Sequence, residues 1–270
     1  MKGGKTNKRS TRDFRAKKSL GQHFLTDEHL ASKIVNLFLE RNKAGAILEI
    51  GPGKGMLTKY LLKKSELKFF AVELDGRMAL LLKQQFPKLE PNLFEADILQ
   101  FDFERIPEME FSVIGNFPYN ISSQILFTLL NFRHRVPLIS GMFQREVAQR
   151  ISSKHANKSY GIISVLLQSF YHCEYLFELG PASFQPPPKV TSAVVQLIRK
   201  EKQPFIEDES FFFRLVKAGF GKRRKTLRNC LKEFSIEKKL LGETVFNQRA
   251  EQLSVEEWIN LSNHIYERNQ

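Results

Sequence analysis

The sequence predicts an α/β fold, with a mostly parallel sheet that carries helices on both faces and a smaller all-helical region after it. Between residues 46 and 200, short apolar runs of strand length alternate with stretches of helical periodicity, a pattern that is typical of parallel sheets. From about Pro204 onward, helical periods dominate and strand-forming residues become rare. A chain of 270 residues with 42% hydrophobic content is long enough to bury one α/β core and a small additional domain.

The first half of the chain contains a complete strand–helix–strand unit. A helix is expected over residues 27–42, where apolar residues recur at helical spacing behind Thr26 or Asp27 as a cap. The elements expected after it are a strand at 46–50, a glycine-rich loop, a helix to residue 64, a strand at 69–72, a helix at 77–85, and strands at 93–96 and 111–115.

The second half begins with a predicted helix over residues 122–130 and then has three extended runs, at 138–143, 162–170 and 190–198. A last helix is expected around residues 258–265. We therefore expect three segments: a basic flexible arm at 1–18, an α/β domain at 19–202 and a helical domain at 203–270.

The positive charge of the chain is concentrated in two segments. The formal net charge is +13, of which residues 1–18 contribute +7 and residues 217–232, which hold no acid, contribute another +7. The remainder sums to −1. An exposed helix face explains most charge runs, but seven cations without an acid repel one another unless phosphates neutralise them. The distribution favours a nucleic-acid partner.

Several classes of protein are disfavoured by the composition. No apolar run approaches the roughly 18 to 20 residues that span a bilayer, so no membrane partner is expected. The N-terminal arm resembles a transit peptide in composition but lacks the apolar half of an amphipathic helix. The two cysteines lie far apart and no histidines have metal-ligand spacing, so we expect no metal site and a cytoplasmic location.

A glycine-rich loop, EIGPGKG at 49–55, follows the first predicted strand. Gly51 and Gly53 allow the backbone to approach a ligand closely, and Glu73, at the end of the next strand, can accept both ribose hydroxyls of an adenosine. A tight structural turn and an NAD site are the alternatives. The spacing lacks the third glycine of the dinucleotide fingerprint.

Polar residues also follow the next two predicted strands. Asp97 can accept the exocyclic amine of a cofactor adenine while Ile98 covers the ring, although an acid at this place is more often a helix cap. Asn116, in Asn-Phe-Pro-Tyr, can accept an amine hydrogen together with a backbone carbonyl of Phe117 or Pro118. Tyr119 can stack on an extruded base. This chemistry favours S-adenosylmethionine over NAD.

Taken together, the motifs resemble the ribosomal RNA adenine dimethyltransferase family. The resemblance runs from about Ser19 to Trp258 and rests on SLGQHFL (19–25), EIGPGKG (49–55), Glu73, Asp97, GNFPYNI (115–121), FQPPPKV (184–190), SAVV (192–195) and RRKTLRN (223–229). The run RAEQLS (249–254) is similar to the small-subunit branch of the family. The implied fold is the Rossmann-like class I S-adenosylmethionine methyltransferase fold over 19–202, with an rRNA-binding helical domain after it.

The resemblance also implies roles for single residues. The cofactor-binding set would be His23, Leu25, Gly51, Gly53, Glu73, Asp97, Ile98 and Asn116. Asn116, Tyr119 and Phe184 would be catalytic, with Phe184 the second aromatic wall around the target adenine. Lys222, Arg223, Arg224, Lys225 and Arg228 would bind RNA. Two positions depart from the family: His23 stands where Asn is more frequent, and Phe117 where Leu or Ile is.

The implied activity is S-adenosylmethionine-dependent dimethylation of two adjacent adenines in a loop near the 3′ end of 16S rRNA, by a monomer acting on an immature small ribosomal subunit. A resistance-type 23S rRNA methyltransferase shares the Asn-Phe-Pro-Tyr chemistry but is disfavoured by the C-terminal motifs. A ribosome-assembly factor whose binding matters more than its methylation is the alternative from another class.

Overall fold

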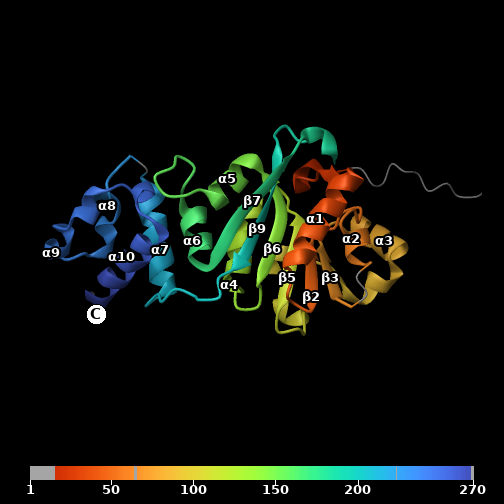
Figure 1. The fold of residues 1–270 in the computed structure, drawn as a ribbon, viewed down its shortest axis with the longest axis horizontal. Helices are drawn as coiled ribbons and strands as arrows, with labels where there is room; N and C mark the ends of the chain where they lie inside the picture. Colours follow the sequence, from red (N-terminus) through yellow and green to blue (C-terminus); the bar gives the residue numbers. More distant parts are fainter. Residues whose placement is uncertain (1–15, 64–65, 223, 269–270) are drawn as a thin grey trace, which may run out of the picture.

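The computed structural model describes residues 16–63, 66–222 and 224–268. Within these residues one seven-stranded sheet runs through the middle of the protein, and helices pack on both of its faces (Figure 1). The C-terminal helices lie together at one end of the molecule, on the side of the edge strand β7 (Figure 1). The predicted α/β fold class is confirmed.

The strands of this sheet have the order β4-β3-β2-β5-β6-β9-β7. The neighbours from β4 through β6 are parallel, and β9 is antiparallel to both β6 and β7. The carboxyl ends of six strands therefore meet at one edge, where open α/β sheets bind ligands. The bounds are β2 (Ala46–Ile50), β3 (Lys68–Glu73), β4 (Leu93–Glu95), β5 (Phe111–Asn116), β6 (Leu138–Gln144), β7 (Tyr171–Leu179) and β9 (Ser192–Arg199).

Each face of the sheet has its own apolar core, because successive side chains along a buried strand point to opposite faces. Ile47 belongs to the core under α1, α2 and α3, whereas Leu48 belongs to the core under α4, α5 and α6. The helices are α1 (Glu28–Arg41), α2 (Thr58–Leu61), α3 (Gly76–Gln85), α4 (Ser122–Asn131), α5 (Arg145–Ser152) and α6 (Ile162–Phe170).

One predicted strand is wrong. The apolar run at residues 162–170, which we predicted as a strand, is the helix α6. The strand β7 begins directly after it, at Tyr171, and was not predicted. Seven of the nine residues of α6 are buried, because the helix packs on α5 and β7 on one side and on α7 and α10 on the other. Because it is buried on most sides, its sequence is a short and mainly apolar run, which periodicity alone does not distinguish from a buried strand.

A second, two-stranded sheet joins two distant segments that the sequence did not indicate as strands. It pairs β1 (Phe24–Leu25) with β8 (Phe184–Gln185) in antiparallel register, with Leu25 opposite Phe184. The backbone N–H of Thr26 extends the connection by donating to the Ser183 carbonyl at 2.9 Å. The segment before α1 is thereby attached to the loop before β9.

The C-terminal helices are α7 (Glu209–Gly221), α8 (Leu227–Cys230), α9 (Lys238–Leu241) and α10 (Val255–Arg268). The boundary that we predicted near residue 202 falls in the connection between β9 and α7. The apolar core continues without interruption from the sheet through α6 into α7 and α10, so the division into separate domains stays a prediction.

Helix α7 runs antiparallel to α6. Its first residue, Glu209, pairs with Arg133, which follows α4, and its Phe220 contacts Tyr160, which precedes α6. Since α6 leads directly into the start of β7 at the amino edge of the sheet, α7 runs away from that edge. The residues after α7 therefore begin on the side where the parallel strands end.

Three further observations concern the described residues only. None of their helices has the length and apolar character needed to cross a membrane. They hold no cluster of three or more His, Cys, Asp or Glu side chains arranged as metal ligands. Cys173 and Cys230 are both free thiols.

The close packing of α7 on α10 leads to a prediction. A Cβ on Gly219 would overlap the ring of Trp258, whereas a Cβ on Gly221, at the end of the same helix, would meet nothing within 4 Å. We expect Gly219→Ala to lower the free energy of unfolding by about 1–3 kcal/mol. Gly221→Ala should leave it unchanged or raise it by up to about 1 kcal/mol, because alanine favours the helix. Urea denaturation of both variants checks this, and equal effects would contradict the packing argument.

Candidate active site

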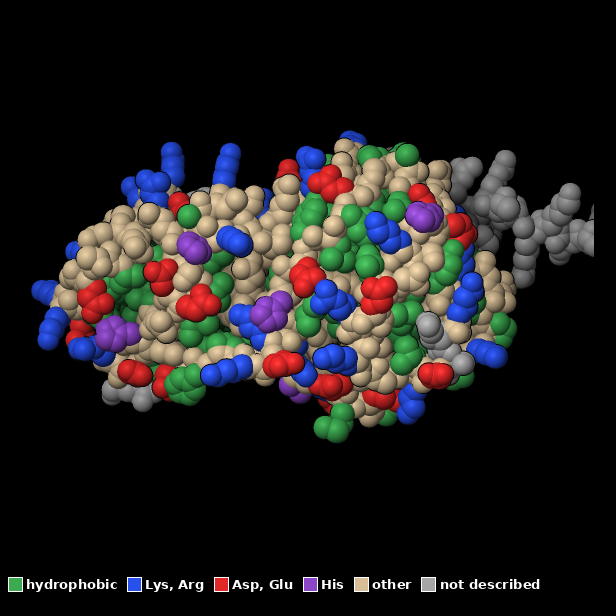
Figure 2. All heavy atoms as spheres, in the orientation of Figure 1, with side chains coloured by type: hydrophobic (Ala, Val, Ile, Leu, Met, Phe, Trp, Pro, Cys, Tyr) green, Lys and Arg blue, Asp and Glu red, His purple; other side chains and the backbone are tan. Residues whose placement is uncertain are grey.

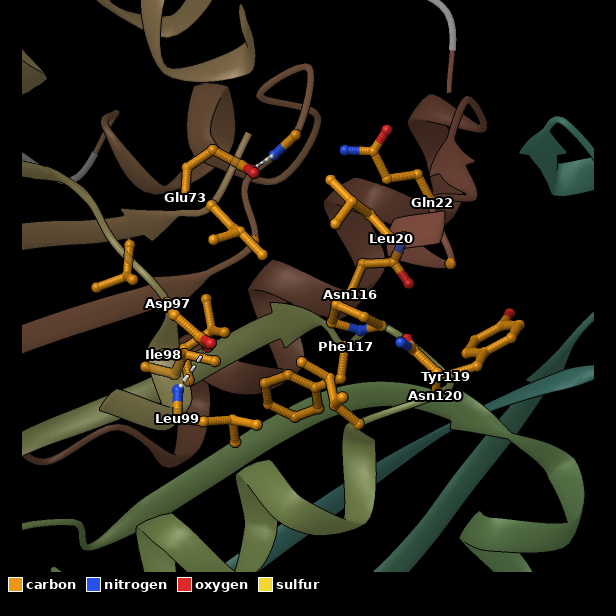
Figure 3. Close-up of a pocket in the computed structure, with 18 of the residues that line it drawn as sticks. Leu20, Gln22, Glu73, Asp97, Ile98, Leu99, Asn116, Phe117, Tyr119 and Asn120 are labelled. Carbon is orange, nitrogen blue, oxygen red and sulfur yellow. Dashed lines mark hydrogen bonds between the residues drawn. The ribbon is translucent and has the colours of Figure 1, made fainter. Parts of the chain in front are cut away.

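A pocket opens at the carboxyl edge of the parallel strands (Figure 3). The glycine loop after β2, the ends of β3 and β5 and the residues after β4 line it, and residues 20–24 before α1 close one side. Most of the predicted site residues line this pocket, namely His23, Gly51, Gly53, Glu73, Asp97, Ile98, Asn116 and Tyr119.

The glycine loop is bent so that its backbone faces the pocket. Gly51 and Gly53 have φ angles of +65° and +56°, in the left-handed region that favours glycine. The N–H of Gly53 donates to Oε2 of Glu73 at 2.9 Å (Figure 3). A side chain at Gly53 would also collide with the ring of Phe24. Both glycines are therefore required by the backbone geometry.

Glu73 ends β3 and is only 5% exposed. Its Oε1 accepts the N–H of Asp75 at 2.8 Å and its Oε2 that of Gly53. Burial raises the pKa of Glu73, and the hydrogen bonds from the Asp75 and Gly53 backbone oppose that rise. Each carboxylate oxygen has a second lone pair, so Glu73 can still accept hydroxyl groups of a ligand.

Asp75 organises the site from behind, and our sequence analysis missed it. Its buried carboxylate accepts hydrogen bonds from Arg77, from Gln22 at 3.1 Å and from Lys17 at 3.3 Å. These donors, Arg77 foremost, hold its pKa well below the usual range. Its position as the cap of α3 was a signal in the sequence, but nothing there indicated that residues 17–22 would fold back onto it.

Asp97 acts as a helix cap, which we had named as the alternative to cofactor binding. It caps the short 3₁₀ turn Ile98–Gln100 by accepting the Leu99 N–H at 2.9 Å (Figure 3). Asp97 also lines the pocket, next to Ile98, which is 6% exposed. The cap fixes the carboxylate in place and leaves its other oxygen available to a ligand.

Asn116 is the last residue of β5, and its side chain has a fixed orientation. Its Nδ2 donates to the backbone carbonyl of His23 at 2.6 Å. A carbonyl can only accept, so the amide nitrogen must be the atom that faces it. Oδ1 of Asn116 accepts no hydrogen bond from any residue that the structure describes, and it remains available at the pocket.

Tyr119 lies beside Asn116 at the mouth of the pocket (Figure 3). Its hydroxyl is hydrogen-bonded to that of Ser192, and burial raises its pKa. The ring of His23 stacks on the Tyr119 ring with 5.4 Å between centroids and 24° between planes, and Nδ1 of His23 is 2.7 Å from the Pro186 carbonyl. One face of the Tyr119 ring is therefore covered by His23, and its stacking on a target base stays a prediction.

Two predicted site residues lie outside the pocket. Leu25 and Phe184 face each other across the β1–β8 pair and are 4% and 2% exposed. Both belong to the apolar core under α1. In this arrangement Phe184 does not form a wall opposite Tyr119, so that role stays a prediction.

The unusual Phe117 is accommodated by small neighbours. Its ring is 1% exposed and packs 5.0 Å from that of Phe143. Gly115 and Gly141 flank it so closely that a Cβ on Gly141 would overlap the ring. The larger side chain thus extends into the core and leaves the backbone of the Asn-Phe-Pro-Tyr segment at the pocket.

The predicted RNA-binding residues lie after α7 and do not line the pocket. Lys222, Arg224 and Lys225 are exposed, and Figure 2 shows Lys and Arg side chains projecting from this end of the molecule. Arg228 instead donates to the Leu241 carbonyl at 2.7 Å and to Asn247 at 3.3 Å, so it also holds the fold together. Arg223 and the arm at 1–15 lie outside the described residues.

Glu49, the first residue of the glycine motif, is a buried acid behind the pocket. It is 1% exposed, and Oγ1 of Thr58 donates to it at 2.7 Å. Burial raises its pKa to about 8. The folded protein therefore keeps a proton that the unfolded chain loses above its ordinary pKa near 4.5, so this group makes stability fall as pH rises from about 4.5 to 8.

A neutral isostere tests this assignment. Glu49→Gln keeps an acceptor for Thr58, and its free energy of unfolding should exceed that of the parent protein increasingly from pH 5 to pH 8, by roughly a few kcal/mol at the upper end. Denaturation at several pH values measures the difference. Glu40→Gln, at an exposed position of α1, is the matched control for removing one carboxylate from the chain.

The chain can now be compared with known proteins. The model of the family described as ribosomal RNA adenine dimethylase matches residues 13–267. The ribosomal RNA small subunit methyltransferase A of Cytophaga hutchinsonii is 47% identical over 249 residues, which cover 92% of this chain and 96% of that one. Its counterpart in Flavobacterium johnsoniae is 48% identical over 252 residues, with 93% and 96% covered.

Solved structures agree at the level of the fold. A dimethyladenosine transferase from Plasmodium falciparum superposes with a TM-score of 0.77 at 24% identity, covering 92% of this chain and 98% of that one. A 23S rRNA methyltransferase superposes with a TM-score of 0.65 at 23% identity, with 90% and 99% covered. The expected class I methyltransferase fold and the resemblance drawn from the motifs are confirmed: the chain belongs to the ribosomal RNA adenine dimethylase family.

Proposed function

We propose that this chain is an S-adenosylmethionine-dependent methyltransferase that dimethylates the N6 amines of two adjacent adenines in a loop near the 3′ end of 16S rRNA. The orientation of the Asn116 amide carries the proposal. Its Nδ2 is committed to the His23 carbonyl, which leaves Oδ1 to accept a hydrogen from an amine. The adenine N6 is a poor nucleophile until such acceptors position it, so alignment is the main catalytic task.

The donor groups of the pocket fit S-adenosylmethionine. Glu73 has acceptor capacity for two ribose hydroxyls, and Asp97 has one for the adenine amine, with Ile98 against the ring. The positive φ angles of Gly51 and Gly53 open the backbone to the methionine part. Bound S-adenosylmethionine supplies an electrophilic methyl group on its sulfonium sulfur.

The target base would enter between Asn116 and Tyr119. Oδ1 of Asn116 accepts one amine hydrogen, and a backbone carbonyl accepts the other. The Pro118 carbonyl already accepts the Ile121 N–H at 3.1 Å, which favours the carbonyl of Phe117 for the second bond. On the face of the Tyr119 ring that His23 covers, a base can stack only if the His23 ring moves away or becomes part of the stack. Phe184 becomes a second wall only if β8 shifts, because its side chain is buried.

The residues from 203 to 270 form the rRNA-binding region in this proposal. Lys222, Arg224 and Lys225 are exposed, and no described acid neutralises their charges. They begin on the side of the molecule where the parallel strands end, which is the side of the pocket. Phosphate contacts of this kind fix the position of an RNA without reading its sequence.

The choice of the small subunit rests on the relatives. The two curated relatives at 47% and 48% identity carry the name of a small-subunit methyltransferase, whereas the 23S rRNA methyltransferase shares the fold at 23% identity. We therefore infer that the substrate is 16S rRNA within an immature small ribosomal subunit. We further propose that the enzyme acts in the cytoplasm and as a monomer.

The substrate is tested by methyl transfer from labelled S-adenosylmethionine to unmethylated small subunits and, separately, to large subunits. Nucleoside analysis should find dimethyladenosine in the small subunit alone, because the rRNA contacts select the particle. Label in the large subunit would contradict the assignment, and no label in either would leave binding to the ribosome as the activity.

The role of Asn116 is tested by Asn116→Ala. Losing a preorganised acceptor should lower kcat by about 10²–10³-fold, while binding to the small subunit stays intact. Asn120→Ala is the matched control, because Asn120 also lines the pocket but has no side-chain hydrogen bond among the described residues. Single-turnover methyl transfer measures both variants, and equal rates would refute the positioning role.

A further inference from the structure

A second pocket lies between the end of α5, the start of β7 and the beginning of α10, and it shares no residue with the pocket of the active site. Helix α6 connects the elements around it (Figure 1). The side chains that give it a chemical character are Lys154, His155, Tyr160, His172, Lys200 and Glu256.

The most informative of these is Tyr160. It is 2% exposed, and its hydroxyl is buried with no hydrogen-bond partner among the described residues. Its ring packs edge-on against Phe220 of α7. Burial, with Glu256 and Glu257 adding to it, raises the pKa of Tyr160, so the hydroxyl keeps its proton. A buried donor without an acceptor is costly, and it lines a pocket that can hold one.

The charges of the pocket favour an anion. Lys154 and Lys200 approach it from the loop after α5 and from the residue after β9, and neither forms an ion pair with any acid that the structure describes. His155 and His172 add further donors, and Glu256 is the one acid in the lining. The pocket also reaches the start of α10, but the first turn of that helix already carries Glu256 and Glu257, and Glu257 accepts the Ser254 N–H at 2.7 Å. The lysines and histidines, and not the helix end, therefore favour an anion.

We propose that this pocket holds a phosphate group of the rRNA backbone, with the Tyr160 hydroxyl and the Lys154 and Lys200 ammonium groups as its donors. A phosphate oxygen accepts hydrogen bonds and never donates them, which matches a set made of a hydroxyl and ammonium groups. The rRNA as the source rests on the proposed function. The pocket gives the enzyme a second anchoring point, next to the junction between α6 and the C-terminal helices.

The test is the affinity of the full-length protein for small ribosomal subunits, measured at several salt concentrations without cofactor. Tyr160→Phe removes only the unpaired hydroxyl, so it should fold with an unchanged or higher melting temperature and bind about tenfold more weakly. The double variant Lys154→Ala/Lys200→Ala should lower the slope of log affinity against log salt by about one. Glu256→Gln should strengthen binding.

Two controls separate this role from a structural one. Tyr171 lines the same pocket, but its hydroxyl is buried and donates to the Val136 carbonyl at 2.9 Å, so Tyr171→Phe should lose stability and keep its affinity. Lys88→Ala, at an exposed position far from this pocket in the sequence and outside its lining, should change the affinity by no more than a surface charge does. Tyr160→Phe binding as tightly as the parent protein would overturn the proposal.

A third arm separates rRNA from a free anion. If the site needs the rRNA chain, inorganic phosphate should raise the melting temperature of the parent protein by no more than it raises that of Tyr160→Phe. Stabilisation by phosphate that Tyr160→Phe abolishes, with rRNA affinity unchanged, would assign the pocket to a free phosphate and overturn the rRNA assignment. If the parent protein fails to methylate small subunits, only the proposed function is refuted. The proposal for the pocket is tested by the binding affinities of the variants relative to that of the parent protein.

Discussion

The carboxylate of Glu73 is the constraint on which the active site depends. It ends β3, the second strand of the sheet beside the edge strand β4, and accepts one backbone N–H from the glycine loop and one from Asp75. The loop after β2 and the turn into α3 are therefore held at a fixed separation by one side chain. Because Glu73 is nearly buried, these two hydrogen bonds are what allows a carboxylate to remain at this place without a counter-ion in direct contact.

The same constraint extends to the segment before α1. Asp75, whose N–H binds Glu73, receives Gln22 and Lys17 through its own carboxylate. One residue later, the His23 carbonyl fixes the amide of Asn116. A continuous set of contacts thus links Glu73, which we propose for the cofactor ribose, to Asn116, which we propose for the target amine. Residues 17–25 line and support the pocket as much as the sheet does, although their regular structure is only the 3₁₀ turn Lys18–Leu20 and the two-residue strand β1.

The sequence predicted the sheet and most of the pocket because both depend on local patterns. Apolar runs identify β2, β3 and β5, and the polar residues that follow them must meet at one edge of a parallel sheet. The failures are long-range. The helix α6 is a short, mainly apolar run because α7 and α10 pack on it as well as α5 and β7, and the contacts of Asp75 with Lys17 and Gln22 span 58 and 53 residues. The burial of Phe184 against Leu25 depends on the β1–β8 pairing, for which neither segment carries a strand pattern.

The active-site pocket by itself cannot select one rRNA site. The two acceptors that we propose at Asn116 and Phe117, with stacking on Tyr119, would suit any extruded adenine, so discrimination among adenines requires surfaces that bind the rest of the RNA. In this protein those surfaces have a fixed position relative to the pocket, because one apolar core runs from the sheet through α6 into α7 and α10. Gly219 against Trp258 and Tyr160 against Phe220 allow little movement between these helices. Under the proposed function, an RNA held by the basic residues after α7 would present to Asn116 only the nucleotides at one set distance and direction. The rigidity of the helical junction would then contribute to the specificity.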